Sequence, residues 1–140
     1  MEKERTLQEI ADSICRRLKK KGFSILRYDA MSTDSIYLKL DYGVCNSIRI
    51  GGHRGKSKLK YRYNIGTNIK KVEQVHDQFT RFYYPASEED RLIQRILFDR
   101  KVKREQYGSR YAAFMTQNKT QMGRVPGFWS SAHEVSTTPT

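Results

Sequence analysis

The sequence predicts an α+β fold with an N-terminal helix, an antiparallel sheet of three to four strands, and C-terminal helices packed on one face. Two observations support this prediction. Between residues 35 and 65, apolar and polar side chains alternate in the way that half-buried strands require. Before and after this region, apolar residues recur three and four positions apart, which is the spacing of amphipathic helices.

Residues 6–21 are predicted to form the first helix. Thr6 and Glu9 have the spacing of a capping box, in which each side chain satisfies a free backbone N–H of the first turn. Gly22 suits a left-handed backbone conformation at the end of the helix. The apolar residues that fall on one face are Leu7, Ile10, Ala11, Ile14 and Leu18.

The sheet is predicted from a series of short apolar segments. Residues 23–28 form the first strand, and the period-two pattern of residues 36–41 forms the next. Gly43 can supply the positive φ of a tight turn that leads into the strand at residues 44–50. A basic loop follows, and a further strand covers residues 59–65. Residues 79–84 have the β propensity of an edge strand, and Pro85 ends it.

The C-terminal region is predicted to begin with a helix capped by Ser87, since acidic residues fill its first turn. Gly108 breaks this helix, and a short additional helix ends near Asn118. We expect residues 1–119 to be a single α+β domain and residues 120–140 to be an extended tail. The outer side of the long helix is expected to carry Arg91, Arg95, Arg100, Lys101, Lys103 and Arg104.

The composition favours a partner with many negative charges. The net charge is +12 at a sequence pI of about 9.9, and no acidic residue lies between Asp41 and Glu73. No apolar run approaches the roughly 18 residues of a membrane span, and the N-terminus lacks the apolar core of a signal peptide. We therefore expect a cytoplasmic protein, with reduced thiols at Cys15 and Cys45. Exposed strand edges allow a dimer without requiring one.

Positive side chains gather on one face of the predicted sheet and in the loop that follows it. If the strands pair as a meander, their polar positions share the face opposite the core, where a phosphate backbone can bind. Glycines in the loop at residues 51–58 let the backbone approach phosphate oxygens. An ordinary solvated sheet face is the alternative interpretation. The predicted nucleic-acid-binding residues are Tyr37, Lys39, Arg49, Arg54, Lys56, Lys58, Lys60 and Arg62.

The sequence gives few indications of catalysis. The cysteines lack metal-site spacing, the histidines lie far apart, and no phosphate loop of the Walker type is present, so no metal or cofactor is predicted. A metal-independent ribonuclease needs an acid or base beside cations, and His53 next to Arg54 can supply both. A histidine in a basic loop also serves as a contact to phosphate or base.

Two resemblances bear on function. The order helix–three strands–helix has the outline of the double-stranded RNA-binding domain, although the motifs of that domain are missing. Residues 47–53 (SIRIGGH), 60–64 (KYRYN) and 83–85 (YYP) resemble small proteins of phages and mobile elements of Gram-positive bacteria, some of which are anti-CRISPR inhibitors. The resemblance spans roughly residues 35–110. It implies a functional cluster of Arg49, His53, Lys60, Tyr61 and Arg62.

Three functions follow as hypotheses. The first is a non-enzymatic protein that binds RNA or a Cas ribonucleoprotein, most concretely an anti-CRISPR inhibitor acting on a Cas nuclease or its guide RNA. The second is a metal-independent ribonuclease that cuts structured or guide RNA with His53 as acid or base. The third is a DNA-binding regulator, although no helix-turn-helix pattern is present.

Overall fold

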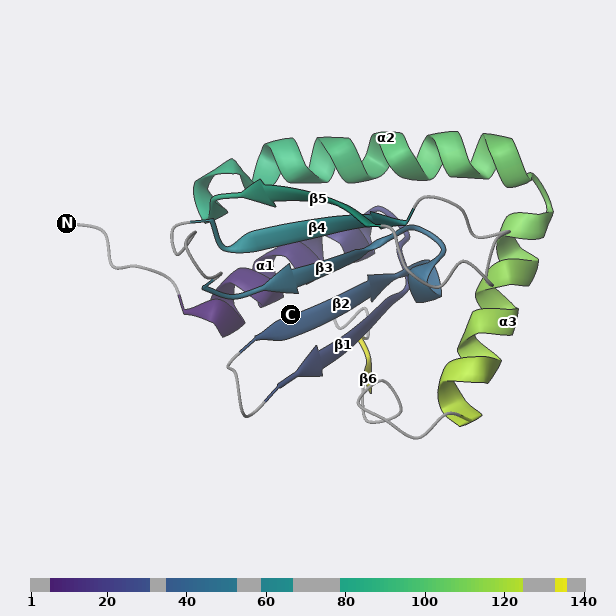
Figure 1. The fold of residues 1–140 in the computed structure, drawn as a ribbon, viewed down its shortest axis with the longest axis horizontal. Helices are drawn as coiled ribbons and strands as arrows, with labels where there is room; N and C mark the ends of the chain where they lie inside the picture. Colours follow the sequence, from purple (N-terminus) through teal and green to yellow (C-terminus); the bar gives the residue numbers. More distant parts are fainter. Residues whose placement is uncertain (1–5, 31–34, 53–58, 67–78, 125–132, 136–140) are drawn as a thin grey trace.

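Six antiparallel strands and three α-helices make up the part of the chain that the computed structural model describes, which is residues 6–30, 35–52, 59–66, 79–124 and 133–135 (Figure 1). The helices are α1 (Leu7–Lys20), α2 (Glu89–Tyr107) and α3 (Arg110–Arg124), with the 3₁₀ turns η1 (Asp41–Gly43) and η2 (Ala86–Glu88). The strands are β1 (Ile25–Asp29), β2 (Ile36–Leu40), β3 (Ser47–Ile50), β4 (Tyr61–Gly66), β5 (Phe79–Tyr84) and β6 (His133–Glu134).

The predicted α+β class is confirmed, and the sheet is larger than predicted. Its strand order is β5-β4-β3-β2-β1-β6, so β1 to β5 form a continuous meander. The prediction of three to four strands falls short because the apolar segments of β1 and β5 both join the sheet, and the two residues of β6 pair with β1. The pairing of β6 lies inside the segment that was expected to be an extended tail.

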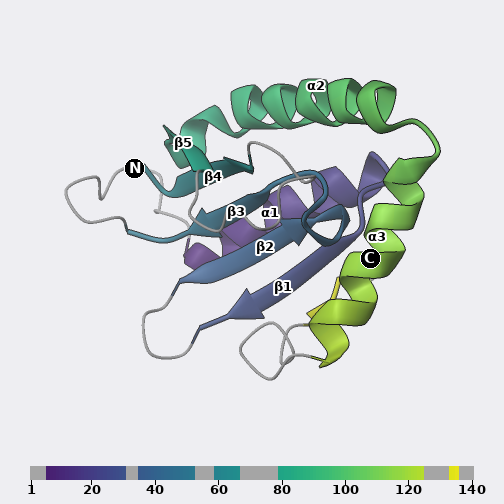
Figure 2. The ribbon, with the colours of Figure 1, turned by 45° about the vertical axis from the view of Figure 1, so that its right-hand side comes forward.

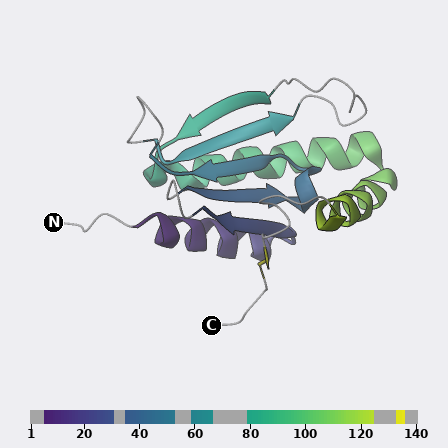
Figure 3. The same cartoon turned by 60° about the horizontal axis from the view of Figure 1, so that its bottom comes forward.

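The helices α1 and α2 pack against the same buried layer of the sheet. In Figure 1, α1 lies behind the strands and α2 runs along the top above β5, and in Figure 3, α1 lies below the sheet and α2 behind it. α3 lies across the strand ends beside η1, which it contacts (Figure 2). The alternation of β2 places Ile36, Leu38 and Leu40 in the core, each no more than 1% exposed. Side chains of both helices meet this layer, among them Ile14, Leu18, Leu92 and Ile96.

The first helix begins as predicted. The Thr6 side chain accepts a hydrogen bond from the backbone N–H of Glu9 at 3.1 Å, and the Thr6 backbone donates to the Glu9 carboxylate at 2.8 Å. This reciprocal pair confirms the capping box. Gly22 follows the helix with a φ of +89°, a conformation that costs glycine little.

The C-terminal helices differ from the prediction in three respects. Ser87 does not cap α2, because it lies within η2 and the N-cap of α2 is the next residue, Glu88. Arg100 was expected on the outer surface but is only 7% exposed, because it pairs with a buried carboxylate. α3 continues past Asn118 to Arg124, since no proline or glycine interrupts the residues immediately after Asn118.

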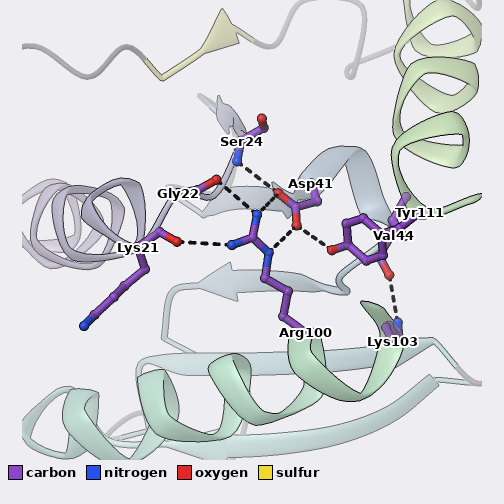
Figure 4. Close-up of polar contacts among 8 residues, drawn as sticks. All are labelled: Lys21, Gly22, Ser24, Asp41, Val44, Arg100, Lys103 and Tyr111. Atoms are coloured by element: carbon purple, nitrogen blue, oxygen red, sulfur yellow. Dashed lines mark hydrogen bonds and ion pairs between the residues drawn. The ribbon is translucent and has the colours of Figure 1, made fainter. Parts of the chain in front are cut away.

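Asp41 is fully buried where the β2–β3 connection meets α2 and α3 (Figure 4). Its carboxylate accepts hydrogen bonds from the Ser24 backbone at 3.0 Å, from Arg100 Nε at 2.8 Å, and from the Tyr111 hydroxyl. Asp41 and Tyr42 both have positive φ, +50° and +54°, which is a strained conformation for residues with side chains. We call Asp41, Arg100 and Tyr111 the Asp41 node.

Arg100 completes the node from α2. Its guanidinium also donates to the backbone carbonyls of Lys21 at 3.1 Å and Gly22 at 3.0 Å, which follow α1 (Figure 4). The guanidinium carbon lies 4.0 Å from the ring centroid of Phe23. The node therefore ties the end of α1, the β2–β3 connection, α2 and α3 together, with each of its charges paired.

Candidate nucleic-acid interface

The sheet face opposite the helices, which we call the open face, is organised in rows that run across the strands. The strand register places residues of adjacent strands directly opposite one another, with their side chains on the same face. One row crosses five strands and consists of Tyr28, Tyr37, Arg49, Arg62 and Tyr83. We call it the central row.

A second row lies beside the central row, two residues along each strand. It consists of Leu26, Lys39, Ser47, Asn64 and Arg81. At the β6 end this row continues to Glu134, which pairs with Leu26 and accepts a hydrogen bond from the Tyr42 hydroxyl. Among the described positions of the open face, Glu134 is the only carboxylate, and it lies at the opposite edge of the sheet from Arg81.

Tyrosines flank the arginines of the central row. The rings of Tyr28 and Tyr37 have centroids 6.4 Å apart and are tilted by 36°. The guanidinium carbon of Arg49 lies 5.8 Å from the Tyr37 centroid, and its Nη2 donates to the Ser35 hydroxyl at 3.1 Å. Aromatic rings beside guanidinium groups are the elements with which sheet surfaces bind stacked bases and phosphates.

Arg62 is the least satisfied cation of the open face. It lies directly opposite Arg49 on β3 and is half-buried, and its Nε atom is buried without a hydrogen-bond partner in the described structure. Burial lowers the pKa of the Arg62 guanidinium, and the positive charges of Arg81 and Arg49 lower this pKa further. Like charges at opposed positions destabilise a sheet, so this arrangement costs the free protein stability.

The ion pairs of the described residues lie elsewhere. Their cations are Arg17, Arg27, Arg91, Arg95 and Arg100. None of these described ion pairs involves Arg49, Arg62 or Arg81, which together place a net positive charge on β3, β4 and β5. The open face is thus electrostatically different from the helix side, where these five arginines are each matched by a carboxylate.

The structure brings together part of the predicted site. Tyr37, Lys39, Arg49 and Arg62 occupy the open face, and burial lowers the pKa of Lys39. Lys60 lies just before β4, two residues ahead of Arg62. Its carbonyl accepts a hydrogen bond from the Gly51 backbone at 2.9 Å. The remaining predicted residues lie outside the described part of the chain; these are His53, Arg54, Lys56 and Lys58.

Sequence reasoning missed the outer parts of both rows. Tyr28, Tyr83 and Arg81 belong to strands that were predicted without a pairing partner or a register in the sheet. These residues could have been found from the alternation of side chains along a strand. Once residues 25–29 and 79–84 are added to the meander, their polar positions fall on the open face. Ser47 and Asn64 were passed over because neither is charged.

The second basic surface, expected on α2, is reduced in the structure. Three of its six cations pair with carboxylates, and Lys103 donates to the Val44 carbonyl at 2.9 Å and to Asn46 Oδ1 at 2.6 Å instead of facing outward. Arg95 donates to the Asp99 carboxylate at 3.0 Å and its guanidinium lies 4.8 Å from the Phe82 ring. Arg91 pairs with Glu88. Arg100 belongs to the Asp41 node, so the outward positive charge of α2 is smaller than the sequence indicates.

The described residues hold no group of three or more His, Cys, Asp or Glu side chains that could bind a metal ion. Both cysteines are buried, and burial raises the pKa of Cys15 to about 11 and that of Cys45 to about 12. Such thiols are poor nucleophiles at neutral pH. Of the described helices, none has both the length and the apolar character needed to cross a membrane.

Comparisons with protein-family models, with curated proteins and with solved structures give no match for this chain.

Proposed function

We propose that this protein is a non-enzymatic RNA-binding module that engages RNA, free or within a ribonucleoprotein, through its open face. The observation that carries the proposal is the set of Arg49, Arg62 and Arg81, which lie on three adjacent strands outside the described ion pairs. A polyanion that neutralises these arginines relieves their mutual repulsion and releases its own counterions.

The tyrosines of the central row support a single strand as the ligand. Neighbouring strands of a sheet lie about 4.8 Å apart, so Tyr28 and Tyr83 stand at the two ends of a row about 19 Å long. Between them, Arg49 and Arg62 can hold phosphates while bases stack on the rings at either end. A flat sheet surface of this kind suits splayed bases better than the groove of a duplex.

The most concrete form of the proposal is an anti-CRISPR inhibitor that acts on a Cas nuclease or its guide RNA. This form is supported by the resemblance of residues 47–53 and 60–64 to small mobile-element proteins. Arg49 and Arg62, which belong to those segments, both lie in the central row. Competition for guide RNA requires the same chemistry as the binding of free RNA, because both ligands present phosphates and bases.

The test is an RNA-binding and cleavage assay. Purified protein is incubated with a labelled guide-type RNA, with and without EDTA, and the products are run on native and denaturing gels. We expect a shifted complex with intact RNA, and weaker complex formation for an Arg49→Gln, Arg62→Gln protein. Shorter RNA that persists in EDTA would instead support the ribonuclease, with His53→Ala as the next variant. The absence of both a shift and cleavage would contradict the proposal.

A further inference from the structure

Two polar atoms on the open face are buried without hydrogen-bond partners in the described structure. They are Nε of Arg62, a donor, and Oδ1 of Asn64, an acceptor. Both residues lie on β4, two positions apart, so their side chains share the open face. Buried polar atoms of folded proteins are nearly always paired, because an unpaired atom has given up its hydrogen bonds to water.

The surroundings of this pair are suited to a charged ligand. Arg62 has Arg49 and Tyr83 as its cross-strand neighbours, and Asn64 has Ser47 and Arg81. The amide nitrogen of Asn64 lies 3.5 Å from the Ser47 hydroxyl. The two residues with unpaired atoms thus lie two positions apart on one face of β4, with Arg49 and Arg81 among their cross-strand neighbours.

We infer that Arg62 and Asn64 bind a ribose 2′-hydroxyl next to an arginine-bound phosphate, so that the open face selects RNA over DNA. The inference rests on the proposed function and specifies its ligand. A 2′-hydroxyl both accepts and donates a hydrogen bond. It would accept from Arg62 Nε and donate to Asn64 Oδ1, which satisfies both atoms at once. Deoxyribose has no such group and leaves both atoms unpaired.

The other groups of a nucleic acid fit this pair less well. Phosphate oxygens only accept hydrogen bonds, so a phosphate would satisfy Arg62 and leave Asn64 Oδ1 unpaired. A base edge can offer both an acceptor and a donor, but DNA carries the same edges, so a base contact would not separate the two polymers. Both side chains are half-buried, and binding would require a rotation about their terminal bonds that exposes the two buried atoms to the ligand.

The experiment compares one single-stranded sequence in three forms: RNA, DNA, and RNA with 2′-O-methyl groups. Affinities are measured by fluorescence anisotropy for the wild-type protein, for Asn64→Leu, and for the control Gln94→Leu at an exposed position of α2. Circular dichroism checks that each variant is folded. We expect the wild type and the control to bind RNA about tenfold more tightly than DNA, since this corresponds to one hydrogen-bonded group.

The 2′-O-methyl form should bind like DNA, because it cannot donate to Asn64. Asn64→Leu should lose RNA affinity, retain DNA affinity, and so bring the ratio of the two affinities close to one. Equal wild-type affinities for RNA and DNA would overturn the inference while leaving nucleic-acid binding intact. An equal loss of RNA and DNA affinity in Asn64→Leu would overturn it in favour of a base contact. Binding of neither polymer would overturn the proposed function itself.

Discussion

Arg100 and Arg62 show how differently the two sides of the sheet treat a positive charge. Arg100, on the helix side, is 7% exposed and has three sets of partners: the Asp41 carboxylate, two backbone carbonyls and the face of Phe23. Arg62, on the open face, is opposed by Arg49, and its Nε has no partner in the described structure. The first residue is placed to stabilise the fold, whereas the second costs the free protein stability.

The difference separates structural charge from charge that is available for a partner. A net charge of +12 alone does not say where a ligand binds, because part of the positive charge on α1 and α2, carried by Arg17, Arg91, Arg95 and Arg100, is matched by nearby carboxylates. Among the arginines outside the described ion pairs, Arg49, Arg62 and Arg81 lie together on adjacent strands of one sheet face. Variants of the two sides should therefore have opposite effects on stability and on RNA binding.

Breaking the Asp41 node should have the largest effect on stability. Arg100→Ala leaves the fully buried carboxylate of Asp41 without its ion-pair partner, and the loss of one partner from such a pair costs about 3–5 kcal/mol. Urea unfolding followed by circular dichroism measures this loss. Lys101→Ala, at the adjacent exposed position of α2, should change stability by less than about 0.5 kcal/mol. Equal stability of the two variants would show that the node is not structural.

Tyr63→Phe tests a second buried contact on the helix side. The Tyr63 hydroxyl donates to Asp99 at 2.7 Å and accepts from Asn46 at 2.9 Å, and its loss should cost about 1–3 kcal/mol. Tyr107→Phe is the matched control, because Tyr107 is also buried but its hydroxyl has no hydrogen bond among the described residues. Equal decreases of the urea midpoint in the two variants would show that the hydrogen bonds of the Tyr63 hydroxyl do not stabilise the fold.

Arg62→Thr should raise stability slightly while it weakens RNA binding. The substitution removes a like-charge opposition to Arg49 and a buried unpaired atom, so the free energy of unfolding should rise by up to about 1 kcal/mol. Arg27→Thr is the contrasting control. Arg27 lies on the helix side of β1, where it donates to Asp12 at 2.7 Å and to Asp29 at 2.8 Å. Loss of the Arg27 side chain should destabilise the protein and leave RNA affinity unchanged. If both variants were less stable than the wild type, Arg62 would be a stabilising residue like Arg27.

A pH-dependent effect is expected from the buried thiol of Cys45. Burial raises the pKa of this thiol from 9.0 to about 12, so the folded protein keeps a proton that the unfolded chain releases above pH 9. Stability contributed by the protonated thiol is complete below pH 9 and declines as the pH rises towards 12. The stability difference between wild type and Cys45→Ala should therefore shrink between pH 8 and pH 10.5 in urea unfolding. A difference that is independent of pH would contradict the burial of the thiol.

Local sequence patterns predicted most of the fold. The capping box of Thr6 and Glu9, the alternation in β2 and the break at Gly108 depend on residues close together in the chain. Pairing across longer distances was less accessible to prediction. Nothing near Arg100 in the sequence indicates that Asp41, 59 residues earlier, will draw it into the core.

The candidate site, like the fold, could be predicted from the sequence only where it depends on local patterns. Tyr37, Lys39, Arg49 and Arg62 follow from alternation within consecutive strands. Arg81 and Tyr83 required the knowledge that β5 pairs with β4. Asn64 could not be singled out, because an uncharged side chain in a strand becomes notable only when its hydrogen bonds are known. The basic loop at residues 53–58 remains a prediction.

The salt dependence of RNA binding is the most direct test of whether the open-face arginines contact phosphates. One variant carries Gln at Arg49, Arg62 and Arg81, and a matched variant carries Gln at the exposed residues Arg16, Lys101 and Arg110, so both lose three positive charges. Single-stranded RNA affinity is measured over a range of salt concentrations. We expect the slope of log K against log salt to become shallower by about 0.7 for each phosphate contact that the open-face variant lacks. The matched variant should keep the wild-type slope. Equal slopes for the two variants would show that RNA responds to net charge alone and would contradict the account.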